Sequence, residues 1–285
     1  MVKRLRILLG PTGVGKTDMG VRLAKKMGCP VLSCDSRQIY RELVIGTAAP
    51  SLEEREGVPH YFIGSHSIHE HYTAGLYELE ALALLDELFK THDEVLMVGG
   101  SGLYIDAVCN GMDDFPPTDL ALRAQLTERL AREGIASLRF ELKRLDIDSY
   151  RTVDIKNPQR VIRALEVTLQ TGRPFSSYKS RRPKERPFEI IKEGIVRERA
   201  ELYSRIDARV ESMLERGLLE EAQALWPNKK LSALRTVGYK ELFDYFDGKC
   251  TLESAILNIK KNTRHYAKRQ CSYWGRDKSI KWMLV

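Results

Sequence analysis

The chain has 285 residues, of which 43% are hydrophobic and 30% are charged. These proportions are typical of a globular protein with a substantial core, and the length allows one large domain or two modest ones. No run of 18 apolar residues occurs, which excludes an ordinary membrane-spanning helix. The formal net charge of +7 suits a nucleic-acid partner, although many basic proteins bind none.

The five cysteines are scattered, odd in number and without a C-x-x-C pair. They therefore indicate neither a zinc site nor a disulfide framework. The basic N-terminus precedes an apolar run that suits a first strand better than a signal peptide. We expect a reducing cytoplasmic environment, where disulfides are rare.

The first predicted strand, residues 7–9, leads into the motif GPTGVGKT and then into a helix over residues 18–27. The pattern G-x-x-x-x-G-K-[ST] aims several backbone N–H groups at one anion, and the following helix adds the positive end of its dipole. Lys16 supplies a mobile positive charge, and the Thr17 hydroxyl can bind Mg²⁺. The motif predicts a phosphate site of the ATP-binding or nucleotide-binding kind. The alternative is a glycine-rich turn beside an ordinary surface lysine.

Two further strands follow in the N-terminal part. A short buried strand is predicted within residues 29–36, a helix over residues 73–91, and a strand over residues 94–98 that ends in the glycine turn GGSGLY. The residues of that helix predicted to face the core include Leu76, Leu79, Ala83 and Leu84. The alternation predicts an α/β fold with a P-loop NTPase-like core, in which helices flank a parallel sheet. Active sites of such sheets lie at the carboxyl ends of the strands, so the turns after these strands are the candidate site.

The pattern changes near residue 113, where the turn-rich DDFPPTD precedes mainly helical sequence. Three helices are predicted, over residues 120–132, 137–145 and 158–171. Asn157 caps the third helix, Pro158 takes its first position, and Gly172 ends it. Its buried stripe is predicted to contain Val161, Ile162, Leu165 and Leu169. The basic segment 176–189 is predicted to be a loop that either contacts RNA or is a solvated linker.

A strand over residues 190–196 and helices over residues 199–216 and 251–275 follow. The last helix carries cations at helical spacing: Lys261, Arg264, His265 and Lys268. The simplest organisation is a core of residues 1–113 and 191–285, interrupted by a mainly helical insertion over residues 114–190.

The position of Asp35 distinguishes among phosphate chemistries. An NTPase needs an acidic residue at the end of a strand such as 94–98, but this strand ends in glycines. Asp35 follows the second strand, where it can act as a general base for a nucleophile opposite the bound phosphates. The alternative is an Asx turn or a helix cap in DSRQ. No lid of clustered arginines is evident, and the large basic insertion with nearby aromatic residues suggests an RNA acceptor.

Seven motifs occur in order along the chain: GPTGVGKT, CDSRQIYRELVIGTAAPS, VPHYFI, VGGSGLY, DIKNPQRVIRALEV, RTVGYKE and HYAKRQCSYW. In this combination the chain closely resembles the tRNA dimethylallyltransferases, also called tRNA isopentenyltransferases. The resemblance implies transfer of a dimethylallyl group from dimethylallyl diphosphate to the exocyclic N6 amine of the adenine on the 3′ side of the tRNA anticodon, with release of diphosphate. It also implies a P-loop core with an inserted helical domain that embraces the anticodon stem-loop. We further expect Mg²⁺ as cofactor, no membrane partner, and a cytoplasmic monomer.

The resemblance assigns roles to particular residues. The donor diphosphate would be bound by Gly10, Pro11, Thr12, Gly13, Val14, Gly15, Lys16 and Thr17, with Thr17 also holding the metal. Catalysis would depend on Asp35 as the base and on Thr12, Lys16 and Arg209 at the diphosphate. The tRNA would contact Asp35, Ser36, Arg37, Gln38, Ser101, Arg123, Gln159, Arg160, Val161, Ile162 and Arg163. Ser101 stands where the family usually has threonine, and the hydroxyl is kept.

Two other functions fit parts of the sequence. A small-molecule or nucleoside kinase would use the P-loop for ATP, and a non-catalytic RNA-binding protein would keep the loop as a relict. The missing arginine lid argues against the kinase. The intact Lys16, Thr17 and Asp35 argue against the binding protein.

Overall fold

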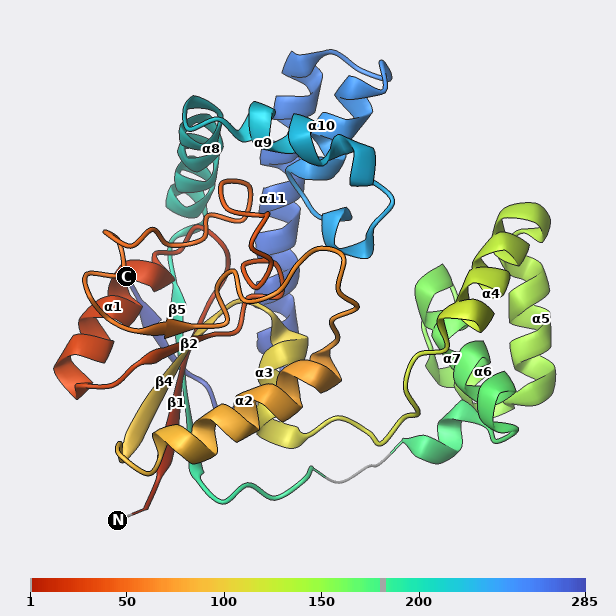
Figure 1. Cartoon of the computed structure of the whole chain (residues 1–285), viewed down its shortest axis with the longest axis horizontal. Coiled ribbons are helices and arrows are strands. Elements are labelled where there is room, and N and C mark those ends of the chain that lie inside the picture. The colour runs from red at the N-terminus through yellow and green to blue at the C-terminus, as the bar shows by residue number, and fades with distance from the viewer. Residues whose placement is uncertain (1, 180–182) are drawn as a thin grey trace. The chain divides into compact units, whose positions relative to one another are not determined.

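The structure, a computed structural model, describes residues 2–179 and 183–285 (Figure 1). The chain forms two compact units. The part up to Asn110 and the segment Glu185–Val285 make the first unit, which we call the core. Gly111–Lys184 make the second unit, which we call the insertion. No helix within the described ranges is long and apolar enough to cross a membrane.

The return of the chain from the insertion differs from the predicted boundary at 190/191. Arg186 already belongs to the core, because its guanidinium donates hydrogen bonds to the carbonyl oxygens of Ala107 and Val108 at 2.9 and 2.8 Å. The strand that follows begins at Glu189 rather than at residue 190. The units therefore divide at 110/111 and 184/185, a few residues before each predicted boundary.

The core contains a six-stranded sheet in which every pairing is parallel, in the order β3-β2-β4-β1-β5-β6 (Figure 1). The strands are β1 Arg4–Leu9, β2 Val31–Ser33, β3 His60–Tyr61, β4 Glu94–Gly99, β5 Glu189–Val196 and β6 Lys281–Leu284. The predicted parallel sheet flanked by helices is confirmed. The sequence did not predict β3, which has two residues, or β6, which is exposed along its length.

Strand β1 lies at the centre of the sheet, and its residues Leu5, Ile7, Leu8 and Leu9 are fully buried. A strand covered on both faces is rich in such apolar residues, although Arg6 interrupts the run between Leu5 and Ile7. In the register, Leu9 at the end of β1 pairs with Gly99 at the end of β4, and β2 pairs with β4 on its other side. The loops that follow β1, β2 and β4 consequently leave the sheet beside one another.

Seven helices complete the described part of the core: α1 Lys16–Met27, α2 Ala74–Leu88, α3 Gly102–Asn110, α8 Arg199–Glu215, α9 Leu218–Leu225, α10 Tyr239–Phe246 and α11 Leu252–Trp274. Two short 3₁₀ turns, Trp226–Asn228 and Ser232–Leu234, lie among the later helices. Right-handed crossovers in this strand order place α1 on one face of the sheet and α2 and α3 on the other. Figure 1 shows α8, α9, α10 and α11 gathered at the end of the sheet where β1 stops.

The buried face of helix α2 differs from the predicted one. Leu76 and Leu79 were predicted to face the core, but they are 41% and 67% exposed, and Ala83 is exposed as well. The buried residues of the helix are Ala74, Tyr77, Glu78, Ala81 and Leu85. The helix is apolar on several sides, so its spacing did not single out one face.

The insertion is helical and has a core of its own. Its elements are α4 Leu120–Glu133, α5 Ile135–Leu145, α6 Ile147–Thr152, α7 Pro158–Thr171 and a 3₁₀ turn at Phe175–Tyr178. Its apolar cluster contains Leu126, Leu138, Leu142, Val161, Ile162, Ala164 and Leu165. Leu169, predicted to be buried with them, is 40% exposed. Of the basic segment predicted to be a loop, residues 180–182 lie outside the described residues.

Candidate active site

The glycine-rich loop after β1 has the geometry that its sequence predicts. Gly13 and Gly15 have φ angles of 82° and 102°, a left-handed conformation that glycine adopts without a steric penalty. Helix α1 begins directly at Lys16, so its first N–H groups face the loop. Loop and helix N-terminus together form a site that favours an anion.

Lys16 is bound within its own loop. Its Nζ donates hydrogen bonds to the carbonyl oxygens of Gly10 and Pro11, each at 2.8 Å. Burial lowers the pKa of Lys16 to about 8; the Asp35 carboxylate opposes this shift, and the Arg209 guanidinium adds to it. Lys16 is therefore near Asp35 and Arg209, and its charge is sensitive to what enters the site.

Three arginines in the segment that follows β5 donate hydrogen bonds to the loop. Arg197 Nε donates to the carbonyl oxygen of Val14 at 2.9 Å, and Arg205 Nε donates to that of Gly13 at 3.0 Å. Arg209 Nη1 lies 3.3 Å from the Thr12 hydroxyl, to which it donates. Burial lowers the pKa of Arg209. The loop is thus surrounded by fixed positive charge.

The loop after β2 holds Asp35 in a defined turn. Asp35 Oδ1 accepts hydrogen bonds from the backbone N–H groups of Arg37 and Gln38, at 2.8 and 3.4 Å. This is the Asx turn that the sequence offered as the alternative to a base. The two are compatible, because no described residue donates to Asp35 Oδ2, which is left to act on a ligand.

The neighbours of Asp35 are bound to the protein. Ser36 N–H donates to Ser101 Oγ at 2.9 Å, and the two hydroxyls lie 3.1 Å apart. Arg37 donates to the carbonyl oxygens of residues 232 and 233, and the Gln38 side chain donates to those of residues 47 and 48. The side chains of Arg37 and Gln38 thus hold the loop in place.

One cavity of about 810 Å³ joins these groups. Its lining includes Thr12, Lys16, Thr17, Asp35, Ser36, Arg37, Gln38 and Arg209. Ser101 is buried at its edge, 8% exposed, and holds Ser36 there. The core therefore brings together the sequence-predicted residues of three strand ends and of α8.

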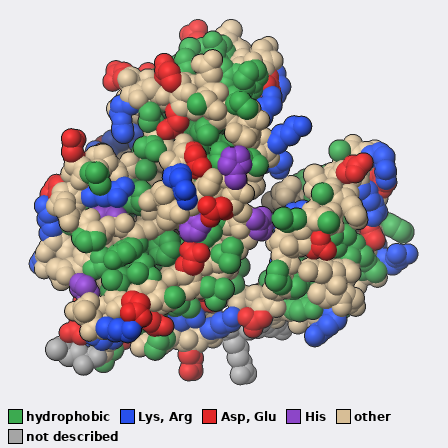
Figure 2. Space-filling model, viewed as in Figure 1, with side chains coloured by type: hydrophobic (Ala, Val, Ile, Leu, Met, Phe, Trp, Pro, Cys, Tyr) green, Lys and Arg blue, Asp and Glu red, His purple; other side chains and the backbone are tan. Residues whose placement is uncertain are grey.

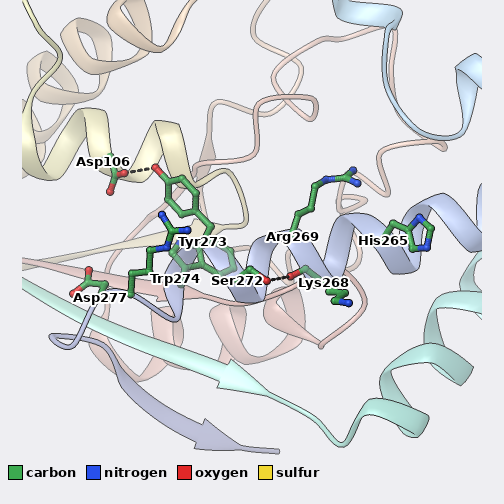
Figure 3. Close-up of a pocket in the computed structure, with 9 residues that line it drawn as sticks. Asp106, His265, Lys268, Arg269, Ser272, Tyr273, Trp274 and Asp277 are labelled. Carbon is green, nitrogen blue, oxygen red and sulfur yellow. Dashed lines mark hydrogen bonds between the residues drawn. The ribbon is translucent and has the colours of Figure 1, made fainter. Parts of the chain in front are cut away.

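A second hollow runs along α11 beside α3 (Figure 3). It has a volume of about 720 Å³ and is lined by Asp106, His265, Lys268, Arg269, Ser272, Tyr273, Trp274, Arg276 and Asp277. The Tyr273 hydroxyl donates to the Asp106 carboxylate, and Figure 3 shows Arg269 and His265 further along the helix. Arg269 lines both cavities, so the hollow adjoins the candidate active site.

The predicted tRNA contacts of the insertion fall into three groups. The side chains of Gln159 and Arg160 are exposed. Those of Val161 and Ile162 are 0% and 1% exposed in the apolar cluster of the insertion, so the expected contact of these positions with tRNA is not made by their side chains. A side chain cannot both fill that cluster and meet a surface partner.

Arg123 and Arg163 have an internal partner. Arg123 Nε donates to Glu166 Oε2 at 2.6 Å, and Arg163 donates to the other carboxylate oxygen of Glu166. Glu166 is 0% exposed. A buried carboxylate needs such partners, so both arginines have a structural task in addition to any contact with RNA.

Sequence reasoning missed Gln270, Arg197 and Tyr266. Gln270 accepts a hydrogen bond from the N–H of Thr12, and Tyr266 lines the cavity near Asp35. Gln270 and Tyr266 belong to HYAKRQCSYW, which served for the resemblance but suggested no role. Their position on a helix far along the chain gave no sign that they approach the P-loop.

Comparison with known proteins identifies the family. The model of the IPP transferase family matches residues 38–277. The chain is 52% identical over 278 residues to tRNA dimethylallyltransferase 2 of Porphyromonas gingivalis, covering 98% of this chain and 93% of that protein. The chain belongs to the IPP transferase family. Another family member, tRNA dimethylallyltransferase 1 of Bacteroides fragilis, is 47% identical over 280 residues, covering 98% of this chain and 93% of that protein.

Solved structures of IPP transferases have the same fold. The tRNA isopentenylpyrophosphate transferase of Bacillus halodurans aligns with a TM-score of 0.73 at 34% identity, covering 99% of this chain and 90% of its own. A eukaryotic dimethylallyltransferase acting on tRNA aligns with a TM-score of 0.83 at 26% identity, covering 99% of this chain and 74% of its own. The resemblance seen in the seven motifs is confirmed. Membership of this enzyme family argues against both the kinase and the non-catalytic binding protein.

Proposed function

We propose that the protein transfers a dimethylallyl group from dimethylallyl diphosphate to the N6 amine of the adenine 3′ to the anticodon. The observation that carries the proposal is the meeting of three residues in one cavity: Lys16 after β1, Asp35 after β2, and Arg209 from α8. A phosphate-binding loop and a carboxylate that line one space suit a reaction that joins a nucleophile to a diphosphate ester. Membership of the IPP transferase family supports the same reaction.

The donor diphosphate is proposed to lie against the loop Gly10–Thr17. Lys16 would exchange its bonds to the loop carbonyls for bonds to diphosphate oxygens, while Arg209 and the Thr12 hydroxyl face the same oxygens. As the allylic C–O bond breaks, negative charge grows on the departing diphosphate. Fixed donors aimed at that charge stabilise the transition state, each by about 3 kcal/mol.

Asp35 is proposed to accept the proton. The adenine amine attacks the allylic carbon, a C–N bond forms as the C–O bond breaks, and one amine proton passes to Asp35 Oδ2. The products are the prenylated adenine and diphosphate. The amine is a weak nucleophile because its lone pair is delocalised into the ring, so holding it in line with the allylic carbon is essential.

Mg²⁺ is the proposed cofactor, and the donor set fits it. The Thr17 hydroxyl makes no hydrogen bond with any described residue and lines the cavity at the start of α1. No group of three or more His, Cys, Asp or Glu side chains suited to a metal occurs in the described ranges. Mg²⁺ commonly takes one or two protein ligands and completes its shell with phosphate oxygens and water. Thr17 would hold the ion, which would neutralise diphosphate charge.

The proposed tRNA surface of the core is the hollow along α11. Figure 2 shows lysine and arginine side chains mixed with acidic ones on the visible face, so charge alone marks no path. The hollow is more specific, because Lys268, Arg269 and Arg276 line it and Tyr273 offers a half-exposed ring. Cations for phosphates and an aromatic face for bases suit single-stranded RNA. We expect Lys268→Ala to weaken tRNA binding and leave donor binding unchanged.

The proposed reaction is tested with labelled donor. The protein is mixed with Mg²⁺, dimethylallyl diphosphate labelled in the prenyl group, and unmodified tRNA, and both RNA label and free diphosphate are measured. We expect equal amounts of label incorporated and diphosphate released, both dependent on tRNA. Diphosphate release without RNA labelling would contradict the proposal. We also expect the protein to be cytoplasmic and monomeric. Sedimentation of the purified protein tests its oligomeric state.

A further inference from the structure

Gln270 bridges two loops of the candidate active site. It belongs to α11 and is 6% exposed. Its Oε1 accepts a hydrogen bond from Thr12 N–H at 2.8 Å, and its Nε2 donates to the carbonyl oxygen of Gly100 at 2.8 Å. A backbone N–H can only donate and a carbonyl can only accept, so this pair of partners fixes which way the amide faces.

The glycine at position 100 makes room for this amide. A Cβ placed on Gly100 would lie 2.4 Å from Gln270 Nε2, a distance that no real contact has. Gly100 lies next to the end of β4, and the P-loop leaves the end of β1 beside it. The Gln270 side chain therefore lies at the point where the two loops separate.

Each bridged loop leads to a proposed reacting group. On the P-loop side, Thr12 accepts a hydrogen bond from Arg209, which is proposed to contact the diphosphate. On the other side, Ser101 follows Gly100 and binds Ser36, the neighbour of Asp35. One amide thus connects the donor loop with the turn that supports the base.

We propose that Gln270 is a positioning residue for the transfer, whose amide sets the spacing between the P-loop and the turn that carries Asp35. This inference rests on the proposed function. The reaction needs the amine, the allylic carbon and the diphosphate in line, and a misplacement of about 1 Å costs on the order of 10²-fold in rate. Gln270 touches neither substrate in this account and acts through Thr12 and Gly100.

A purely structural role would predict a different result. If Gln270 only fills space in the core, a side chain of similar length and volume replaces it without loss of rate. Gln270→Met keeps the volume and removes both hydrogen bonds. Gln270→Glu keeps the acceptor for Thr12 N–H but, when ionised, cannot donate to Gly100.

The experiment compares Gln270→Met and Gln270→Glu with wild type and with Gln223→Met, an exposed glutamine on α9. Thermal melting, tRNA affinity, affinity for isopentyl diphosphate with Mg²⁺, and the single-turnover rate at saturating substrates are measured. For Gln270→Met we expect a melting temperature and tRNA affinity close to wild type, diphosphate affinity about tenfold weaker, and a rate about 10²-fold lower. For Gln270→Glu we expect a similar loss of rate, because the donor to Gly100 is gone.

The proposal would be overturned if Gln270→Met kept both its rate and its diphosphate affinity within threefold of wild type. It would also be overturned if rate and affinity fell only in proportion to the amount of folded protein. The diphosphate arm needs no transfer. If the wild-type protein showed no transfer, the proposed function would fail. The difference in affinity for isopentyl diphosphate between wild type and Gln270→Met would still show whether Gln270 positions the P-loop.

Gly100→Ala provides a second variant, because its added methyl group must displace the same amide. We expect it to lower the single-turnover rate as Gln270→Met does. The double variant should be little slower than either single variant, since both act on one bridge. Independent, multiplying losses would contradict a shared bridge.

Discussion

At the scale of residues, Asp35 combines two tasks that one substitution separates. Its Oδ1 closes a turn by accepting from the N–H groups of Arg37 and Gln38. Its Oδ2 is proposed to accept the amine proton. An asparagine keeps a side-chain oxygen for the turn but cannot serve as a base at neutral pH, whereas an alanine loses both functions.

We therefore predict that Asp35→Asn folds and binds tRNA as wild type does, and that its single-turnover transfer falls by about 10²–10⁴-fold. Asp35→Ala should show the same loss of transfer together with lower thermal stability, because the turn is broken. Rapid quenching and counting of labelled RNA measures the rates. Transfer by Asp35→Asn at the wild-type rate would reduce Asp35 to a turn residue.

The pKa of Lys16 predicts how diphosphate binding depends on pH. In the substrate-free protein its pKa is lowered to about 8, chiefly by burial, so its charge is lost as the pH rises through that value. A diphosphate favours the protonated form, so binding should be constant below about pH 8 and weaken above it, by at most about tenfold per pH unit. Titration with isopentyl diphosphate between about pH 7 and 9.5 measures this.

Lys16→Met is the control for this titration. It removes the titrating group, so binding should be weaker throughout and should lack the change above about pH 8. Wild-type affinity that stays flat across the whole range would show that Lys16 does not titrate on binding.

The sequence predicted those residues whose position follows from local backbone rules. The glycines of GPTGVGKT and the start of α1 fix the P-loop within a dozen residues, so its anion site was predictable. Gln270 was not, because it meets Thr12 only through the packing of a helix 258 residues away along the chain. The hydrogen bonds of Arg37 to the carbonyl oxygens of residues 232 and 233 were hidden for the same reason.

At the scale of elements, the insertion separates surface arginines from structural ones. Arg160 is exposed near the start of α7, and Arg163, one turn later, binds buried Glu166. Both were expected to contact tRNA. Their different surroundings predict different consequences when each is replaced.

Arg160→Ala should leave stability unchanged, weaken tRNA binding, and reduce the slope of log affinity against log salt by about one if it contacts a phosphate. Arg163→Ala should destabilise the protein by about 1–3 kcal/mol, because it removes one of the two partners of a buried carboxylate. Filter binding at several salt concentrations and denaturant titration measure the two effects. Equal effects of both variants on stability would contradict this distinction.

Helix position was predicted better than helix orientation. The capped helix α7 was found with its ends, because Asn157, Pro158 and Gly172 mark them locally. The face of α2 was misread because Leu76 and Leu79 look like core residues and only the packing against α3 shows otherwise. The short helices α9 and α10 carry too few residues for a clear period and were not predicted.

At the scale of the whole molecule, the core holds an anion site, the Asp35 carboxylate and the hollow along α11 within one unit. P-loops bind phosphate in many different reactions, so the loop alone does not identify the reaction. The proposed reaction follows from Asp35, which comes after β2 and lines the same cavity, and from membership of the IPP transferase family. The loop is proposed to hold a diphosphate that is discarded.

The most direct test of this account is to locate the transferred group. The protein is incubated with Mg²⁺, dimethylallyl diphosphate and an unmodified anticodon stem-loop. The stem-loop has one adenine directly 3′ to the anticodon and other adenines elsewhere. The masses of the RNA fragments are then measured by mass spectrometry. We predict a gain of one C₅H₈ unit on the adenine directly 3′ to the anticodon and on no other base. An unmodified stem-loop, or the same gain spread over other adenines, would contradict the account.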